Sequence, residues 1–233
     1  MKIEILADAD AVSRKAAAII AAEARAAVAA RGRFVMAVSG GRTPWVMLRA
    51  LANEEVPWPW VHVLQIDERI APAGDPDLNL THLTESLLSR APLPPAQLHA
   101  MPVELADLTA AAMDYSKTLE KLAGSPPVLD LAHLGLGEDG HTASLVPNDP
   151  VLDITDRNVA VTGAYKGRRR MTLTFPVLDR ARRVLWLVTG ADKAPMLERL
   201  LSHDPAIPAG RVRSDNALVL ADRAAAAEAG SLG

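Results

Sequence analysis

The sequence predicts an α/β fold, with helices on both faces of a mostly parallel β-sheet. Short apolar runs alternate along the chain with longer segments of helical periodicity, the pattern of repeated β–α units. The apolar runs are nearly continuous, which is typical of strands buried on both sides. Neither an internal repeat nor a low-complexity linker divides the 233 residues. We therefore expect a single domain that spans residues 1–233.

The N-terminal half predicts three strands with helices between them. The strands are expected at residues 2–6, 33–38 and 61–66. An Ala-rich helix over residues 10–31 separates the first two and ends near Gly32.

A short helix follows the second strand, with Thr43 expected as its N-cap and Pro44 at its first helical position. A polar loop after the third strand leads to a helix near residues 79–90. The remaining expected elements are a helix over residues 104–123, strands over residues 129–136, 157–163, 169–175, 183–189 and 217–222, a helix that starts at Asp192 and Lys193, and an Ala-rich terminal helix.

Polar loops follow four of the predicted strands. They are SGGRTP (39–44), DER (67–69), GEDGH (137–141) and GADK (190–193). Ligands of parallel α/β sheets bind beyond the carboxyl ends of the strands. We therefore expect these loops to meet at one edge of the sheet and to form a binding site.

The stretch HLGLGEDGHTASLVPN (133–148) contains a Gly-x-Gly-x-x-Gly motif that formally fits a dinucleotide-binding loop. That interpretation requires a helix after the glycines, and Pro147 leaves room for little more than one turn. The Asp139 carboxylate would also lie beside the phosphates. The alternative is that the glycines bend the loop and present Asp139 and His141. Histidine suits a general base near neutral pH, and a carboxylate can orient its ring.

The loop SGGRTP lacks the lysine of a Walker A motif, but its backbone N–H groups can bind an anion at the following helix N-terminus. Such a site suits a phosphomonoester; the alternative is a plain strand–helix turn. Arg170 lies in the strand expected over residues 169–175, and Lys193 lies at the start of a later predicted helix. Both are well placed to bind the phosphate of a sugar phosphate. From the residues alone, we expect an enzyme for a small phosphorylated substrate.

Composition argues against several other classes. The formal net charge of −3 does not favour nucleic acid or an anionic membrane as a partner. The chain has no cysteine, its six histidines lack metal-ligand spacing, and it has no Gly-x-Ser-x-Gly motif, so we expect no metal, no cofactor and no serine triad. No apolar run is long enough for a membrane span or a signal peptide, so we expect a cytoplasmic protein.

Five motifs together resemble the 6-phosphogluconolactonases, within the glucosamine-6-phosphate isomerase/6-phosphogluconolactonase family. They are AVSGGRTP, QIDERIAP, HLGLGEDGHTASLVPN, RRRMTLTFPVL and VTGADKAPML, in the family's order and approximate spacing. The resemblance implies a Rossmann-like fold shared with glucosamine-6-phosphate deaminases and ribose-5-phosphate isomerase-like proteins. It also implies hydrolysis of 6-phosphogluconolactone, a phosphosugar lactone, in the oxidative pentose phosphate pathway.

The resemblance also implies roles for individual residues. His141 matches the general base, Asp139 the neighbouring carboxylate, and Arg69 an arginine that could stabilise the oxyanion. The matches on the substrate and phosphate side are Ser39, Gly40, Gly41, Arg42, Thr43, Asp67, Asn79, Arg170 and Lys193. Leu78 departs from the usual serine before Asn79, and Val146 replaces a common phenylalanine.

Two other functions stay open at this point. A glucosamine-6-phosphate deaminase would carry Asp-Glu-Tyr where this chain has Asp-Glu-Arg, and a glutamate at the position of Val146. Asp67 alone could still abstract a proton, so an isomerase or deaminase is the first alternative. The second is a non-catalytic sugar-phosphate sensor, against which the Asp139–His141 pair argues because a binder needs no base. The sequence does not indicate an oligomeric state.

Overall fold

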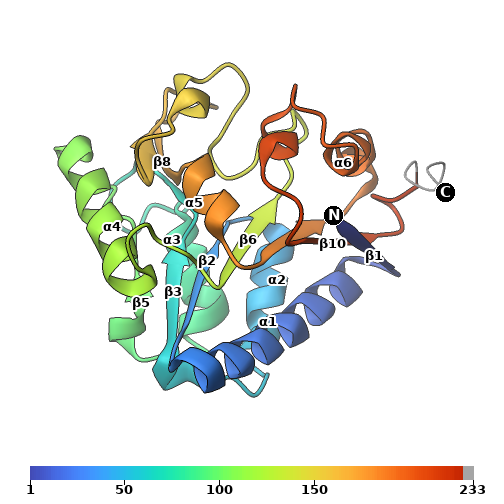
Figure 1. The fold of residues 1–233 in the computed structure, drawn as a ribbon, viewed down its shortest axis with the longest axis horizontal. Coiled ribbons are helices and arrows are strands. Elements are labelled where there is room, and N and C mark those ends of the chain that lie inside the picture. Colours follow the sequence, from blue (N-terminus) through green and yellow to red (C-terminus); the bar gives the residue numbers. More distant parts are fainter. Residues whose placement is uncertain (228–233) are drawn as a thin grey trace.

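A computed structural model describes residues 1–227 of the chain. Seven parallel strands form the main sheet in the order β1-β10-β9-β6-β2-β3-β5, and β4-β8-β7 form a second, antiparallel sheet (Figure 1). The strands are β1 (Lys2–Leu6), β2 (Phe34–Val38), β3 (Val61–Gln65), β4 (Asp67–Arg69), β5 (Leu98–His99), β6 (Leu131–Gly135), β7 (Val159–Val161), β8 (Arg170–Leu173), β9 (Val184–Val188) and β10 (Ala217–Asp222). The helices are α1 (Ala9–Arg31), α2 (Arg42–Leu51), α3 (Asn79–Leu83), α4 (Leu108–Ala123), α5 (Phe175–Arg180) and α6 (Ala194–Leu201).

The main sheet separates two apolar cores, so its central strands are buried on both faces. On β2, Val35 and Ala37 belong to the core shared with α4, α5 and α6, whereas Phe34, Met36 and Val38 belong to the core shared with α1 and α2. In Figure 1, α1 runs along the bottom of the view while α5 and α6 lie above the strands. The predicted α/β fold with helices on both faces is confirmed.

The long helix α1 has the boundaries that its end residues predict. The side chain of Asp8 accepts a hydrogen bond from the Ala11 backbone N–H at 2.8 Å and caps the first turn. Gly32 ends the helix in the left-handed conformation, with φ at 73°. Its buried face is mostly alanine, which allows α1 to pack closely on the sheet and on α2.

Several expected elements are wrong in detail. The N-cap of α2 is Gly41 rather than Thr43. The helix expected from residue 104 begins at Leu108, and the one near residues 79–90 is α3 followed by a π turn over Thr84–Leu88. Residues 223–227, where an Ala-rich helix was expected, form turns, and the rest of that segment lies outside the described residues.

The expected strands over residues 157–163 and 169–175 exist in shorter form but do not join the parallel sheet. Both pair antiparallel in the second sheet, together with β4, which arises from the residues expected as the DER loop. Phe175 begins α5, a helix that the sequence pattern did not predict. The second sheet places β4 and β8 beside each other at the edge of the main sheet where the site lies.

Candidate active site

The loops that follow β9, β6, β2 and β3 meet in one cleft of about 310 Å³ at the carboxyl edge of the main sheet. The predicted convergence of polar loops is therefore confirmed. All expected site residues line this cleft except Asp139, which lies behind His141. Those that line it are Ser39, Gly40, Gly41, Arg42, Thr43, Asp67, Arg69, Asn79, His141, Arg170 and Lys193.

Asp139 and His141 form a tight pair at the cleft wall. The carboxylate Oδ1 lies 2.5 Å from His141 Nδ1 and also accepts the His141 backbone N–H at 3.1 Å. Partial burial favours the neutral carboxyl, but hydrogen bonds and charge from His141, with a hydrogen bond from Tyr165, outweigh it and lower the pKa of Asp139 to about 2. Asp139 is therefore ionised and fixes the ring, and with Nδ1 donating to it the lone pair lies on Nε2.

Two glycines shape the loop that presents His141. The Gly137 N–H donates to the His141 carbonyl at 2.8 Å, and a Cβ on Gly137 would stand 2.0 Å from His141 Nδ1. Gly140 adopts φ of 80°, and a Cβ there would stand 2.6 Å from Ile207. No helix follows in residues 141–149, so the context of a dinucleotide loop is missing. The glycines serve the turn and the space around the imidazole.

Arg69 enters the cleft from β4 and is held by α3. Its Nη1 donates to the Asn79 side-chain oxygen at 2.8 Å and to the Asp77 carbonyl at 2.6 Å. The Asn79 amide nitrogen in turn donates to the Asp67 carbonyl at 2.9 Å. Asn79 is buried, and its side chain is engaged at both ends by protein groups. It therefore supports Arg69.

The neighbouring Glu68 points away from the cleft into the protein. Its carboxylate accepts the backbone N–H groups of Arg69, Asn79 and Leu80, and the Gln65 side chain, all at 2.7–2.8 Å. Burial raises the pKa of Glu68, and these hydrogen bonds oppose the rise. Glu68 joins β3, β4 and the start of α3, and so fixes the positions of Arg69 and Asn79.

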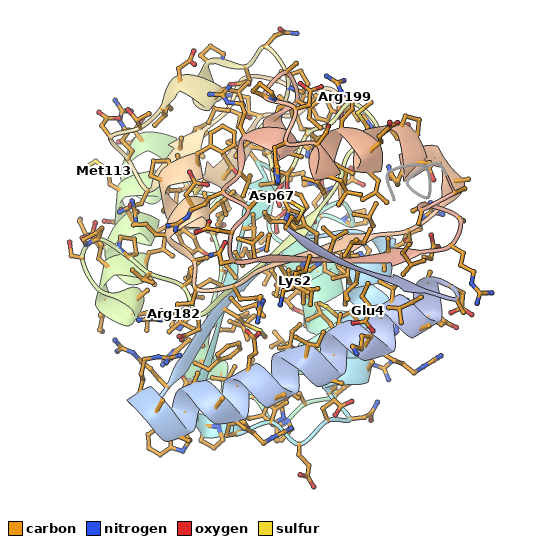
Figure 2. The ribbon with its side chains drawn as sticks, turned by 45° about the vertical axis from the view of Figure 1, so that its right-hand side comes forward. Lys2, Glu4, Asp67, Met113, Arg182 and Arg199 are labelled. Atoms are coloured by element: carbon orange, nitrogen blue, oxygen red, sulfur yellow. The ribbon has the colours of Figure 1, made fainter. Side chains whose placement is uncertain are left out.

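Asp67 and Arg170 lie on the paired strands β4 and β8 of the second sheet, opposite Thr172 and Arg69 respectively, and both are buried. Figure 2 shows Asp67 in the middle of the molecule. Its Oδ2 accepts the Ser144 hydroxyl at 2.6 Å, which ties β4 to the loop after His141. Burial lowers the pKa of Arg170 and Asp67 opposes this, but no carboxylate within residues 1–227 pairs with the guanidinium, and its Nε has no hydrogen-bond partner. A buried cation without an ion pair suits an anionic ligand.

The opposite wall is formed by the start of α2 and the loop after β9. Gly41 has φ of 130°, and a Cβ on Gly40 would stand 1.9 Å from the Asn79 side chain, so this backbone needs glycine. The Thr43 hydroxyl lies 2.7 Å from the Thr189 hydroxyl, which joins the two loops. Lys193 contacts Asp192 at 3.2 Å and Glu138 at 3.6 Å, so its ammonium is already partly neutralised.

Ser39 lines the cleft and is also hydrogen-bonded to the interior of the sheet. Its hydroxyl donates to the His133 carbonyl at 3.0 Å, and its backbone N–H donates to His133 Nδ1 at 3.3 Å. His133 is fully buried in the sheet, and burial lowers its pKa to about 4. The hydrogen bonds between Ser39 and His133 fix the point at which the chain leaves β2 and enters the loop at the cleft.

Three residues with polar contacts at the site were not singled out from the sequence: Ser144, Tyr165 and Thr189. Ser144 follows His141 closely, so its proximity to that residue could have been suspected. Tyr165 and Thr189 reach the site through the tertiary arrangement, and nothing in their local sequence identifies them.

The site combines an oriented histidine, an adjacent carboxylate and a group of arginine and lysine side chains at the carboxyl edge of a parallel sheet. These features define an α/β enzyme for a small anionic substrate. The chain belongs to the family described as glucosamine-6-phosphate isomerases/6-phosphogluconolactonase, whose profile matches residues 7–220.

Curated relatives share this family over most of their length. A 6-phosphogluconolactonase of Synechocystis is 36% identical over 87% of this chain and 86% of its own. A 6-phosphogluconolactonase of Mycobacterium tuberculosis is 38% identical over 97% of both chains.

Solved structures agree on the fold. The 6-phosphogluconolactonase of Thermotoga maritima superposes with a TM-score of 0.84, at 28% identity, over 95% of this chain and 98% of its own. The enzyme of that name from Trypanosoma brucei gives 0.86 at 26% identity, over 100% and 98% of the two chains. A monomeric glucosamine-6-phosphate deaminase gives 0.85 at 20% identity, over 98% of this chain and 100% of its own, and shares the fold. Within residues 1–227, no helix is long and apolar enough to cross a membrane.

Proposed function

We propose that the protein hydrolyses 6-phosphogluconolactone to 6-phosphogluconate in the oxidative pentose phosphate pathway, as a cytoplasmic enzyme, with His141 as general base. The observation that carries the assignment of the base is the 2.5 Å contact between Asp139 and His141 at the wall of a basic cleft. The family and the curated relatives support the choice of substrate.

In the proposed mechanism, His141 Nε2 takes a proton from a water molecule while the water oxygen attacks the lactone carbonyl carbon. Asp139 stabilises the imidazolium that results. When the tetrahedral intermediate collapses, the bond from the carbonyl carbon to the ring oxygen breaks. The imidazolium then returns its proton to that oxygen, and histidine is ready for another cycle.

Arg69 is the proposed stabiliser of the oxyanion. Only its Nη1 is engaged by described residues, and these bonds hold the guanidinium in place before the substrate binds. A preorganised donor of this kind contributes about 3–4 kcal/mol to a developing oxyanion. A positioned general base adds about 10²–10⁴ in rate.

The phosphate is proposed to bind among Arg170, Lys193 and the backbone of the loop from Gly40 to Thr43. Arg170 has no acidic partner in the described chain, so a phosphate would supply the missing negative charge. Lys193 would exchange its contacts with Asp192 and Glu138 for the phosphate. Asp67 and Asn79 then act mainly by fixing the walls of the site.

A coupled assay tests the proposal. Glucose-6-phosphate dehydrogenase generates the lactone in place, and its disappearance is followed with wild-type protein, with His141→Ala and without protein. We expect rapid loss of lactone with the wild type, and a rate lower by about 10²-fold or more for His141→Ala. If the variant binds the substrate as tightly as the wild type, the loss of rate reflects loss of the base and not loss of binding. A wild-type rate in the variant would rule out His141 as the base.

The deaminase alternative is tested in the same preparation by ammonia release from glucosamine 6-phosphate. Val146, which occupies the position of the deaminase glutamate, is buried and apolar, so it offers no acid for that reaction. We expect no ammonia release above background. Ammonia release faster than lactone hydrolysis would reverse the assignment. A sensor would bind the phosphosugar and leave lactone loss at the uncatalysed rate.

A further inference from the structure

We propose that Tyr165 is a positioning residue for the Asp139–His141 pair, so that the site works through a Tyr–Asp–His chain. The inference rests on the proposed lactone hydrolysis and adds a residue that neither the motifs nor the comparisons assign. The contact that carries it is the hydrogen bond from the Tyr165 hydroxyl to Asp139 Oδ2, at 2.9 Å.

The hydrogen bonds to Asp139 are divided between its two oxygens. Oδ1 accepts both bonds from His141, while Oδ2 accepts the phenol. A carboxylate held on one oxygen alone can rotate about its Cβ–Cγ bond and carry the imidazole with it. The phenol blocks that rotation, because a turn of the carboxylate would break its bond. Tyr165 therefore determines the orientation of a ring that it meets only edge-on, at 5.4 Å between centroids.

A tight turn holds Tyr165 at this position. The backbone groups of Tyr165 and Arg168 exchange hydrogen bonds at 2.9 and 3.2 Å, and between them Lys166 and Gly167 have φ of 49° and 79°. Positive φ at both central residues is the geometry of a type I′ turn, which joins closely spaced antiparallel segments. The turn links β7 and β8, so the phenol is placed by the second sheet and the histidine by the main sheet.

The charges around the phenol support a role beyond packing. Arg170 lies over the Tyr165 ring at 5.0 Å and Lys166 at 5.5 Å, while Asp139 and Glu138 are the acidic groups that influence it. Lys193, Arg69 and Asp67 face the same cleft as His141. Burial and then the Asp139 carboxylate raise the pKa of Tyr165 to about 12, so the phenol keeps its proton and donates throughout the neutral range.

The decisive variant is Tyr165→Phe, which removes the hydroxyl and keeps the ring that contacts Arg170 and His141. We expect kcat to fall about tenfold, the scale of one hydrogen bond to a charged group, with KM unchanged. Without the phenol, Asp139 carries a less dispersed charge and holds the proton on the imidazole more strongly. The acid limb of the kcat/KM profile should therefore move to higher pH.

The matched control is Tyr115→Phe, because the chain has only two tyrosines. Tyr115 is buried in the core, and its hydroxyl contacts the Gln65 and His99 backbone away from the cleft. This change should lower stability and leave the pH profile in place. Tyr165→Leu also removes the ring beneath Arg170, so it should raise KM as well as lower kcat. An unaltered kcat and pH profile in Tyr165→Phe would overturn the proposal.

A spectroscopic titration tests the contact without any assay of activity. Tyrosinate absorbance is followed to high pH in the wild type and in Asp139→Asn. We expect Tyr165 in the variant to ionise at lower pH, toward the ordinary tyrosine value of about 10, because the adjacent negative charge is gone. Identical titrations would overturn the inference. By contrast, a wild type that does not hydrolyse the lactone, with the titration shift present, would refute the proposed function and leave the Tyr165–Asp139 contact established.

Discussion

At the scale of single residues, the three glycines of the Gly-x-Gly-x-x-Gly motif have different surroundings. A Cβ on Gly135 would meet nothing within 4 Å, whereas on Gly137 it would collide with the His141 ring and on Gly140 with Ile207. Gly140 alone among them needs a positive φ, at 80°. Gly137 and Gly140 are therefore required by their local surroundings, whereas Gly135 is not. The match of the three glycines to a cofactor-binding motif is a coincidence.

This difference predicts an unequal response to alanine. In Gly137→Ala the new methyl group must displace the imidazole, whose Nδ1 lies 2.0 Å from the Cβ position, and so break the contact with Asp139. We expect kcat to fall by about 10²-fold, the lower end of the contribution of a positioned base, with the fold retained. Kinetics and thermal unfolding measured on the purified variant check both parts.

Gly135→Ala is the matched control, since it adds the same methyl group two residues away in open space. It should keep a kcat close to that of the wild type. Equal loss in the two variants would show that the loop responds to any added side chain, and that the space beside His141 is not the cause.

The contact between Asp139 and His141 could be predicted from the sequence because the two residues are neighbours in one loop. The supports of the site could not. Tyr165 is 26 residues from Asp139, and Asn79 is 12 residues from the backbone of Asp67 that it contacts. Asn79 lines the cleft, as expected, but the side-chain hydrogen bonds that it makes to Arg69 and Asp67 were not foreseen. Such contacts depend on how sheets and helices pack, which local pattern does not contain.

At the scale of elements, the unit formed by β4 and α3 depends on one buried carboxylate. Glu68 accepts hydrogen bonds from the first two residues of α3 and from the Gln65 side chain, so a three-residue strand and a five-residue helix are held as one piece. Both elements are too short to be stable through their own backbone hydrogen bonds. The unit carries Arg69 and Asn79 into the cleft.

Replacing Glu68 with glutamine should therefore weaken both the fold and the site. In Glu68→Gln, the amide nitrogen would replace an oxygen that accepts two hydrogen bonds and would face two N–H donors, so we expect the free energy of unfolding to fall by about 2–4 kcal/mol. The kcat should fall as well, because Arg69 loses its support. Urea unfolding and steady-state kinetics provide the measurements. Glu85→Gln, at an exposed position on the next turn, is the control and should change neither quantity.

Among the elements, most strands of the main sheet could be predicted from the sequence, but the second sheet could not. Apolar runs located the main-sheet strands except β5. The central strands are buried on both faces and are therefore nearly continuous apolar runs, whereas the edge strand β1 is largely exposed and shows alternation in KIEIL. The second sheet was missed because its strands are three or four residues long, and because Asp67–Arg69 resembles a solvated turn. Pairing of β4 with β8 joins segments about a hundred residues apart, and period-two alternation in RRMTLTF does not specify the partner.

At the scale of the whole molecule, a fully buried histidine in the main sheet makes the stability of the protein depend on pH. His133 lies on β6 between the two cores, its Nδ1 accepts the Ser39 N–H, and its Nε2 has no partner among the described residues. Burial lowers its pKa to about 4. The pKa of the half-buried His99 is also lowered to about 4, first by burial and then by the charges of His62 and Lys121.

These shifts predict a fold that loses stability in mild acid. The unfolded chain binds a proton at His133 near pH 6.5, but the folded chain does so only near pH 4. The contribution of neutral His133 to the free energy of unfolding is therefore fully present above about pH 6.5. About 3 kcal/mol of it is lost as the pH falls toward 4.

In His133→Asn, the side-chain oxygen can still accept the Ser39 N–H, although the smaller residue leaves a cavity. We expect this variant to be less stable than the wild type near pH 7.5 and to lose less on acidification to about pH 4.5. Urea unfolding at the two pH values measures the difference. An equal loss in both proteins would mean that His133 is protonated in the folded state, and that acid sensitivity must be assigned to other groups, with His99 the next to replace.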